Sequence, residues 1–187
     1  VSDISSIAGL RAMRQLNLRE TKVEDLTSLS GFARLNELNL ALTSVQDLRP
    51  LSKISGIRLL DLFGTRITEI GPIGGHTGME SLRIACTKVE DLSPVAGFLA
   101  LKELDADATP ISDLTPLSGL INMESLQTCR TKVETIAPIS GLTSLKTLHL
   151  SGVPIKDIVV LSNLSKLEIL DLSRTKIRDF SPLSALG

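Results

Sequence analysis

Three residues in the second half of the chain have the types that nucleophilic catalysis uses. Cys129 offers a thiol, His149 an imidazole and Asp171 a carboxylate, at intervals of 20 and 22 residues. These groups could serve as nucleophile, general base and orienting acid if they lay on successive strands. A polar sheet surface produces such a row by chance, however, and no turn or helix N-terminus nearby supplies oxyanion donors. We therefore expect no catalytic residues and no enzymatic activity in this chain.

Two other patterns suggest ligands only in part. Asp105 and Asp107 share one side of a strand and could bind a divalent metal, but too few oxygen ligands are in view and Arg83 is a simpler charge partner. The segment 71–78, GPIGGHTG, is rich in glycine like a phosphate-binding loop, yet it lacks a Gly-Lys-Ser/Thr ending and a helix pattern after it. We predict neither a metal site nor a cofactor. His76 is interpreted as an outward-turned substitute for an apolar residue.

All of these residues are positioned by a repeat that runs through the whole sequence. Its mark is a Thr followed two places on by an aliphatic residue. At intervals of 22 the same place holds Thr in seven of eight units, with Val153 as the exception. The consensus is L-x-x-L-x-L-x-x-T-x-[IV]-x-D-L-x-P-L-S-G-L-x-x, and 187 residues make eight and a half units. Self-similarity at a fixed period predicts one elongated solenoid, a single domain over 1–187.

The two halves of each repeat have different periods. The alternating leucines of segments such as 35–40 have the period of a strand, and identical units stacked in one direction pair their strands in parallel. In the second half, apolar residues follow at intervals of three, which favours 3₁₀ or extended turns over an α-helix. Proline recurs there, and Ser93, Thr115 and Ser181 precede it as candidate caps. We expect an α/β-type, mostly β solenoid with a concave parallel sheet and a 3₁₀ or extended convex side.

Several columns of like residues have structural interpretations. The β-branched residues that include Val1, Val45 and Ile177 predict a buried ridge where the chain leaves each strand. The short carboxylates of the Asp column, beside turns, are expected to accept backbone N–H bonds. The Thr hydroxyls are expected to bond the backbone of their own or the next coil. Ala106 and Thr128 replace Leu in the inner strand column, which predicts an under-filled core at that point.

Composition excludes several classes of partner. The 20 basic and 21 acidic residues nearly cancel and form no basic stripe, so we expect no nucleic acid, and no apolar run is long enough for membrane insertion. Cys86 and Cys129 lie two repeats apart, too far for a disulfide, and two free thiols favour a reducing, cytoplasmic compartment. Asn163 heads a formal glycosylation sequon, but we interpret it as Asn replacing Gly at a turn with positive φ.

Segments such as 38–43 and 170–175, each followed by a stretch like 113–120, resemble the leucine-rich repeat family. The length of 22 residues resembles its short subclass, found in bacterial internalins and in regulatory subunits of protein phosphatase. The resemblance implies a right-handed coil that binds another protein through its concave sheet. Those relatives usually carry Asn where this chain has Thr, so the resemblance here implies a Thr-based ladder.

Function is expected at the strand positions that this template leaves free. They form the solvent-exposed, concave side of the sheet, called the sheet face below. Phe63 is expected to be the only exposed aromatic residue, because Phe32, Phe98 and Phe180 occupy core columns. It either anchors an interface or lies flat across its neighbours. The candidate partner-binding residues are Leu42, Leu59, Asp61, Phe63, Arg83, Glu103, Asp105, Asp107, Gln127, Arg130, His149, Asp171 and Arg174.

The ends of the chain and its wider role leave alternatives open. Val1 begins and Leu186 ends in mid-repeat without a cap, so we expect a piece of a longer parent, or ends covered by another chain. The leading hypothesis is a protein-recognition module. The alternative is the substrate-recognition arm of a larger enzyme or bacterial effector whose catalytic domain lies outside these residues, and a passive spacer is a third possibility.

Overall fold

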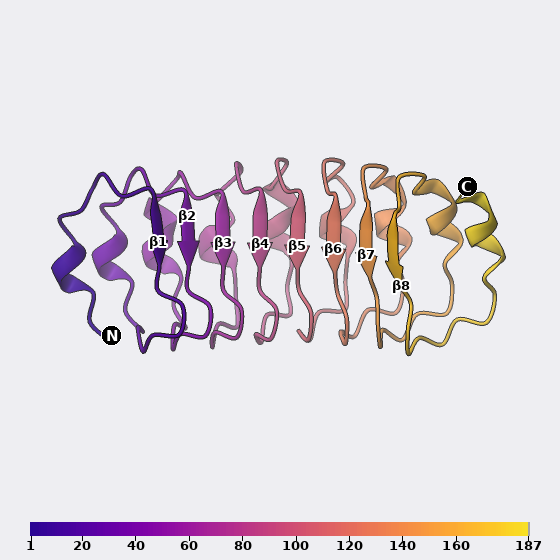
Figure 1. Ribbon diagram of the computed structural model, residues 1–187, viewed down its shortest axis with the longest axis horizontal. Helices are drawn as coiled ribbons and strands as arrows, with labels where there is room; N and C mark the ends of the chain where they lie inside the picture. Colours follow the sequence, from indigo (N-terminus) through magenta and orange to yellow (C-terminus); the bar gives the residue numbers. More distant parts are fainter. Residues whose placement is uncertain (187) are drawn as a thin grey trace.

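The chain forms an elongated coil in which short strands alternate with short 3₁₀ turns (Figure 1). The computed structural model describes residues 1–186. The strands are β1 (Gln15–Asn17), β2 (Glu37–Asn39), β3 (Leu59–Asp61), β4 (Ser81–Arg83), β5 (Glu103–Asp105), β6 (Ser125–Gln127), β7 (Thr147–His149) and β8 (Ile169–Asp171). The 3₁₀ turns are η1 (Ser5–Ile7), η2 (Thr27–Leu29), η3 (Arg49–Lys53), η4 (Gly71–Ile73), η5 (Ser93–Gly97), η6 (Thr115–Leu117), η7 (Ala137–Gly141), η8 (Val159–Asn163) and η9 (Ser181–Ala185). Within residues 1–186 no helix is long and apolar enough to cross a bilayer.

The strands pair in parallel, in the order β1 to β8, and each step of the register advances by one repeat. Leu16 therefore lies beside Leu38, and Leu148 beside Leu170. The sheet occupies one side of the coil and the 3₁₀ turns the other (Figure 1). This confirms the predicted parallel-sheet solenoid with a 3₁₀ side.

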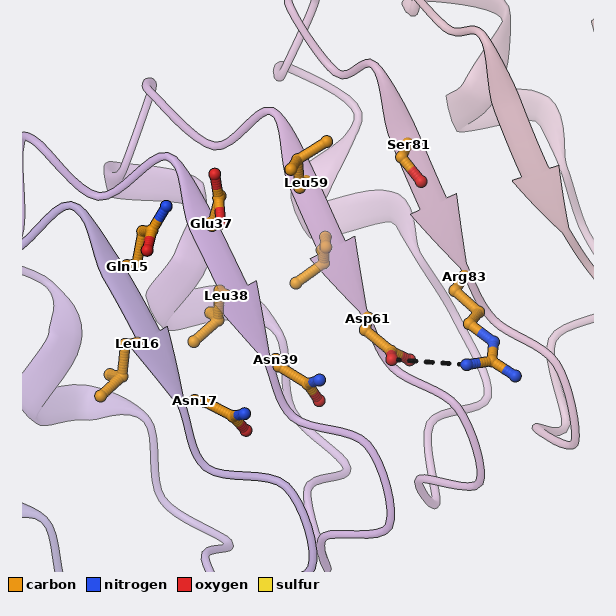
Figure 2. Close-up of a pocket in the computed structure, with 11 residues that line it drawn as sticks. Gln15, Leu16, Asn17, Glu37, Leu38, Asn39, Leu59, Asp61, Ser81 and Arg83 are labelled. Atoms are coloured by element: carbon orange, nitrogen blue, oxygen red, sulfur yellow. Dashed lines mark ion pairs between the residues drawn. The ribbon is translucent and has the colours of Figure 1, made fainter. Parts of the chain in front are cut away.

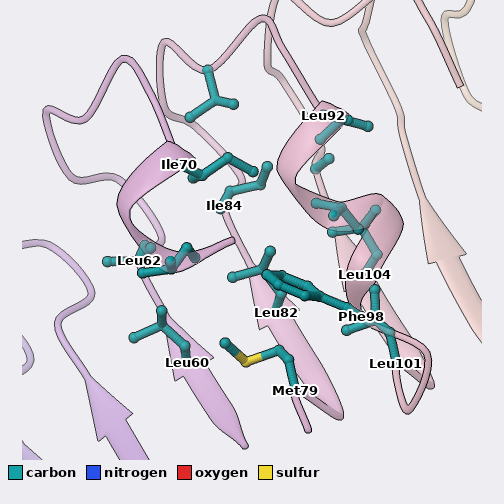
Figure 3. Packing of buried hydrophobic residues seen from close by; sticks show 14 of the residues in the cluster. Leu60, Leu62, Ile70, Met79, Leu82, Ile84, Leu92, Phe98, Leu101 and Leu104 are labelled. Atoms are coloured by element: carbon teal, nitrogen blue, oxygen red, sulfur yellow. The ribbon is translucent and has the colours of Figure 1, made fainter. Parts of the chain in front are cut away.

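The core fills the space between the sheet and the 3₁₀ turns. In β4 and β5, Leu82 and Leu104 point inward and meet the fully buried Phe98, which follows η5 (Figure 3). The β-branched ridge is buried from Val23 to Ile155, as expected. Its two end members differ from the rest, because Val1 is 79% exposed and Ile177 is half-buried.

The Asp column holds the start of seven of the nine 3₁₀ turns among the described residues. The Oδ1 atom of Asp91 accepts the backbone N–H of Ser93 at 2.7 Å, and the same bond recurs in the Asp column from Asp3 to Asp179. This confirms the structural interpretation of the column. The capping prediction is wrong: Ser93, like Thr115 and Ser181, is the first residue of its turn, and the residue before it occupies the cap without a side-chain bond. The aspartate already satisfies the free backbone donor.

The Thr column closes the turn after each strand. In seven repeats the hydroxyl donates to the carbonyl oxygen three residues earlier in its own coil, with Thr43 to Leu40 at 2.7 Å as an example. Val153 is buried at the same place and has no hydroxyl to donate. The Thr ladder expected in place of Asn is thus built from bonds within coils.

Positive φ angles occur in the column directly before Thr. The members are Glu20, Leu42, Gly64, Cys86, Ala108, Arg130, Gly152 and Arg174, with φ from 53° to 72°. Asn163 is not among them and instead ends η8, so the interpretation of Asn163 as a positive-φ turn residue is wrong. The left-handed residue is needed where the chain turns out of the strand, because the turn geometry is the same in every coil.

His76 lies in the core, which corrects the prediction that it turns outward. Its side chain is 2% exposed, Nδ1 lies 2.9 Å from the carbonyl oxygen of Ile73, and Nε2 has no partner among the described residues. Ile54 and Phe98 hold the same place in the coils on either side and are fully buried, so His76 follows the inward direction of its column, and the carbonyl compensates one nitrogen. Ala106 and Thr128 are also fully buried, and Thr128 Oγ1 lacks a partner in the described chain. An under-filled core at that point stays a prediction.

Candidate functional site

The last residue of most strands serves the turn that follows it as well as the sheet face. Oδ1 of Asp61 accepts the N–H of Phe63 at 2.9 Å, and Oδ1 of Asp105 accepts the N–H of Asp107 at 3.1 Å. Asn17, Asn39 and Asp171 make the same bond to the residue two places on. Three residues expected to be free for binding therefore also have a structural role. Sequence reasoning missed this role, although the asparagines in the same column were its signal.

Arg83 on β4 is the centre of the sheet face. Its Nε donates to Oδ2 of Asp105 at 2.8 Å, its NH1 lies 3.7 Å from Oδ2 of Asp61, and its guanidinium lies 4.7 Å from the centroid of the Phe63 ring. This confirms Arg83 as the partner of Asp105. The expectation that Phe63 alone is exposed is wrong, because it is half-buried beneath Arg83 while Phe180 is 52% exposed.

Two shallow hollows on the sheet face meet at Arg83. The larger, about 560 Å³, extends over β1–β4, and the smaller, about 310 Å³, extends over β4–β6. Figure 2 shows Asn17, Asn39 and Asp61 in a row along the larger hollow, with the ion pair to Arg83 closing the row. The residues of the larger hollow on β1 and β2 were not among the sequence candidates. They are Gln15, Leu16, Asn17, Glu37, Leu38 and Asn39.

Beside the smaller hollow, Asp107 and Cys129 are joined by a hydrogen bond. The N–H of Cys129 donates to Oδ1 of Asp107 at 2.6 Å. Burial is the main cause that raises the pKa of the Asp107 carboxyl, and the bond from Cys129 and the nearby Arg130 partly oppose it. Burial, followed by the charge of Asp107, raises the pKa of the Cys129 thiol to about 11. The thiol is therefore protonated at neutral pH.

The row of Cys129, His149 and Asp171 does not form a nucleophilic triad. His149 lies beside Asp171 in register, as expected, but its other neighbour is Gln127. Cys129 is 8% exposed, and no hydrogen bond joins it to His149 within the described residues. The pKa of Asp171 is lowered chiefly by hydrogen bonds from Ser173, and His149 contributes less. Since a protonated, buried thiol is a poor nucleophile, this geometry supports no covalent chemistry.

The remaining candidates lie at two kinds of position. Leu59 on β3 is 38% exposed, and Glu103 on β5 accepts a bond from Ser81. Leu42, Arg130 and Arg174 belong instead to the positive-φ column, beyond the strand ends. No group of three His, Cys, Asp or Glu residues in the part of the chain that the structure describes is arranged to hold a metal ion.

The residues just before the strands form a charge ladder that sequence reasoning missed. Arg58 pairs with Glu80, Lys102 lies 3.5 Å from the same carboxylate, and Lys146 Nζ lies 2.7 Å from Glu124. The signal was the alternation of sign at intervals of 22 residues. Because all of these side chains except Glu80 are about half exposed to solvent, which screens their charges, the ladder contributes little to stability.

Comparisons with known proteins agree with this geometry. A family profile described as leucine-rich repeats in two copies matches residues 143–185. Internalin C2 of Listeria monocytogenes is 30% identical, with a TM-score of 0.90 over 91% of this chain and 75% of that one. Internalin F of the same organism is 27% identical, with a TM-score of 0.81 over 100% of this chain and 62% of that one. The chain belongs to the leucine-rich repeat family and has internalins among its relatives.

A more distant structure shares the fold alone. The leucine-rich repeat ectodomain of the plant receptor kinase GASSHO1/SCHENGEN3 from Arabidopsis thaliana, solved with Casparian strip integrity factor 2, has a TM-score of 0.88 at 15% identity. The match covers 99% of this chain and 24% of that one. No curated protein sequence matches significantly.

Proposed function

We propose that the chain is a protein-recognition module and that its sheet face is the contact surface. The observation that carries this proposal is the contrast within each strand: the inward residue is Leu in all eight strands, whereas the outward residues differ from strand to strand. A surface with only a structural role does not need such variety, whereas a surface that recognises one specific partner does. The fold of the plant ectodomain, solved with its own bound factor, supports the proposal at the level of fold only.

The contact residues proposed are those on or beside the two hollows and their continuation toward β8. Arg83 is pre-positioned by Asp61, Asp105 and Phe63, so its guanidinium is ordered before a partner arrives and loses little side-chain entropy on binding. The contact residues proposed from the sequence are Leu42, Leu59, Asp61, Phe63, Arg83, Glu103, Asp105, Asp107, Gln127, Arg130, His149, Asp171 and Arg174, and the larger hollow adds Asn17 and Asn39.

The test compares affinity capture by the wild type with capture by a sheet-face variant, Leu59→Asp with Gln127→Lys. Neither side chain makes a hydrogen bond or ion pair within the described residues, so the variant should keep the fold. The expected result is specific retention of a protein by the wild type and loss of that protein by the variant. Circular dichroism of both proteins checks that they are folded.

A matched control places the same two changes on the opposite side of the coil. Leu99 is 63% exposed and Thr143 is exposed, both on the turns that follow 3₁₀ segments, so Leu99→Asp with Thr143→Lys alters charge equally away from the sheet face. The control should retain the partner as well as the wild type does. If the control loses the captured protein while the sheet-face variant retains it, the contact surface lies on the convex side and the proposal is wrong.

A further inference from the structure

The turn bonds at the strand ends determine which atom each residue presents to the sheet face. Oδ1 of Asn17 and Oδ1 of Asn39 each accept a backbone N–H at 2.9 Å. Their outward atom is therefore the amide nitrogen, a hydrogen-bond donor. At Asp61 and Asp105, where Oδ1 makes the same bond, the outward atom is a carboxylate oxygen. The column thus changes from donor to acceptor between β2 and β3.

Only some of these outward atoms are free. The outward oxygens of Asp61 and Asp105 face Arg83, whereas the amide nitrogens of Asn17 and Asn39 have no partner among residues 1–186. Three further carboxylates of the region have no ion pair in the described chain. They are Glu37, Glu103 and Asp107. The face therefore offers adjacent free donors at β1–β2 and, beside β5, negative charge without an ion pair, which Arg130 offsets only in part.

Resting on the recognition function above, we propose that the sheet face binds a basic peptide segment in an extended conformation. Its carbonyl groups accept hydrogen bonds from Asn17 and Asn39, and its cationic side chains lie against Glu103 and Asp107. Four steps of about 4.8 Å separate β1 from β5, a distance of about 19 Å. At about 3.3 Å per residue, the segment has about six residues between its two contact points. It crosses both hollows and passes Arg83.

Other ligands complement only part of this pattern. A polyamine or a metal ion would satisfy the carboxylates but has no acceptors for the two amide donors. An acidic peptide or a nucleic acid would meet the donors but be repelled by Glu103 and Asp107. A peptide with carbonyl groups at one end and cations at the other matches both. The chemical class is therefore fixed by the two ends of the face together.

The test uses two N-acetylated, amidated hexapeptides, Ala-Ser-Ala-Ser-Lys-Arg and Ala-Ser-Ala-Ser-Glu-Glu, titrated into the isotope-labelled chain. Nitrogen–proton NMR spectra report directly on the side-chain NH₂ signals of Asn17 and Asn39. The basic peptide should shift both signals and the backbone signals of β1–β5 in a saturable way, and the acidic peptide should not. Unmoved signals with the basic peptide, or equal shifts with the acidic one, would overturn the proposal.

Two isosteric variants separate this proposal from general charge attraction. Glu103→Gln with Asp107→Asn keeps each accepting oxygen and should weaken binding about tenfold. Glu90→Gln with Glu134→Gln removes the same charge from exposed positions outside the strands and should leave the affinity unchanged. Asn17→Asp with Asn39→Asp keeps the turn bonds but removes both donors. It should weaken binding, although its added negative charge alone would strengthen it, so tighter binding contradicts the proposal.

Failure of this inference is distinguishable from failure of the recognition function. If the hexapeptide does not bind while the Leu59→Asp, Gln127→Lys variant still loses the captured protein, the sheet face recognises another chemistry and only the inference fails. If that variant retains the captured protein, the recognition function of the sheet face fails instead.

Discussion

The interior of the coil and the sheet face are made by alternate residues of the same strands, and they vary in opposite ways. The inward position at the centre of each strand is Leu from Leu16 to Leu170. The outward column from Asn17 to Asp171 contains amides, carboxylates, a guanidinium and an imidazole. Each coil packs mainly on its neighbours, so an inward change must fit two adjacent layers. An outward side chain meets solvent and has no such constraint.

The contrast is incomplete, and its exceptions are informative. Outward Asn and Asp side chains both accept the same turn bond through Oδ1. These positions can therefore vary only in the other terminal atom, which is an amide nitrogen in Asn and a carboxylate oxygen in Asp. Inside, His76 and Thr128 each place a polar atom that has no partner among the described residues in a column that is otherwise apolar.

The largest effect is expected at Phe98, in the interior. Phe98 is fully buried between the sheet and η5, so Phe98→Ala should lower the free energy of unfolding by about 3–5 kcal/mol. Its neighbour Leu99 is 63% exposed, and Leu99→Ala should change that free energy by less than about 0.5 kcal/mol. Guanidinium unfolding followed by circular dichroism measures both. Equal losses would show that the interior and the surface are not distinguished as argued.

The next largest effect on stability is expected in the positive-φ column, where every residue has a similar φ angle but the residue types vary. At Gly64, with φ of 64°, a Cβ atom would lie 2.7 Å from Cδ2 of Leu42. Gly64→Ala should therefore cost about 1–2 kcal/mol, and the reverse change at Ala108, with φ of 53°, should stabilise by about 0.5–1 kcal/mol. Thermal unfolding of the two variants checks the opposite signs. A loss in both would mean that side-chain contacts outweigh the backbone term.

A smaller, stabilising effect is expected at His76, the polar exception of the interior. His76→Leu removes the unpaired Nε2, while the carbonyl of Ile73 still accepts the backbone N–H of residue 76 at 3.0 Å. The free energy of unfolding should rise by about 1 kcal/mol. His149→Leu on the sheet face is the control and should leave stability nearly unchanged. A destabilised His76→Leu protein would indicate that the bond from Nδ1 outweighs the unpaired nitrogen.

The 22-residue period was sufficient to predict the solenoid, the parallel sheet and the roles of the Thr and Asp columns, because each depends on a residue type repeated in register. The positive-φ column could not be predicted in this way. Leu42 and Arg130 adopt a conformation that their own types disfavour, since the turn out of the strand imposes it. His76 was misplaced because a lone polar residue suggests a surface, whereas its depth is set by the coils on either side.

The sheet-face positions followed from the alternation of the strands, but their chemistry did not. The half-burial of Phe63 depends on Arg83, which comes from the next coil, and Arg83 is held in turn by residues 22 positions away on both sides. The outward atoms of Asn17 and Asn39 depend on turn bonds that are visible only in three dimensions. Side-chain pairing between coils, rather than the fold, limited the sequence-based prediction.

The smallest effect is a difference in pH dependence between the Asp column and the sheet face. Hydrogen bonds from the hydroxyl and the backbone N–H of Ser93 lower the pKa of Asp91, so its folded pKa lies below the unfolded value of 3.8. The unfolded chain then binds the proton more readily, and the contribution of Asp91 to stability is present above the unfolded pKa and lost as the pH falls through the lowered one. Asp91→Asn keeps the accepting oxygen and should reduce the loss of stability between pH 7 and pH 3, measured by urea unfolding.

The contribution of Asp107 to stability should change with pH in the opposite direction to that of Asp91. Burial raises its pKa in the folded state, so the folded chain binds the proton more readily than the unfolded chain. Its contribution to stability therefore increases as the pH falls through the raised value, and Asp107→Asn should steepen the acid loss that Asp91→Asn reduces. A partly desolvated carboxylate that lowers stability is expected on a binding surface, where the charge of a partner compensates it. It is not expected in the Asp column, which stabilises the fold. The same sign in both variants would remove this distinction between the two regions.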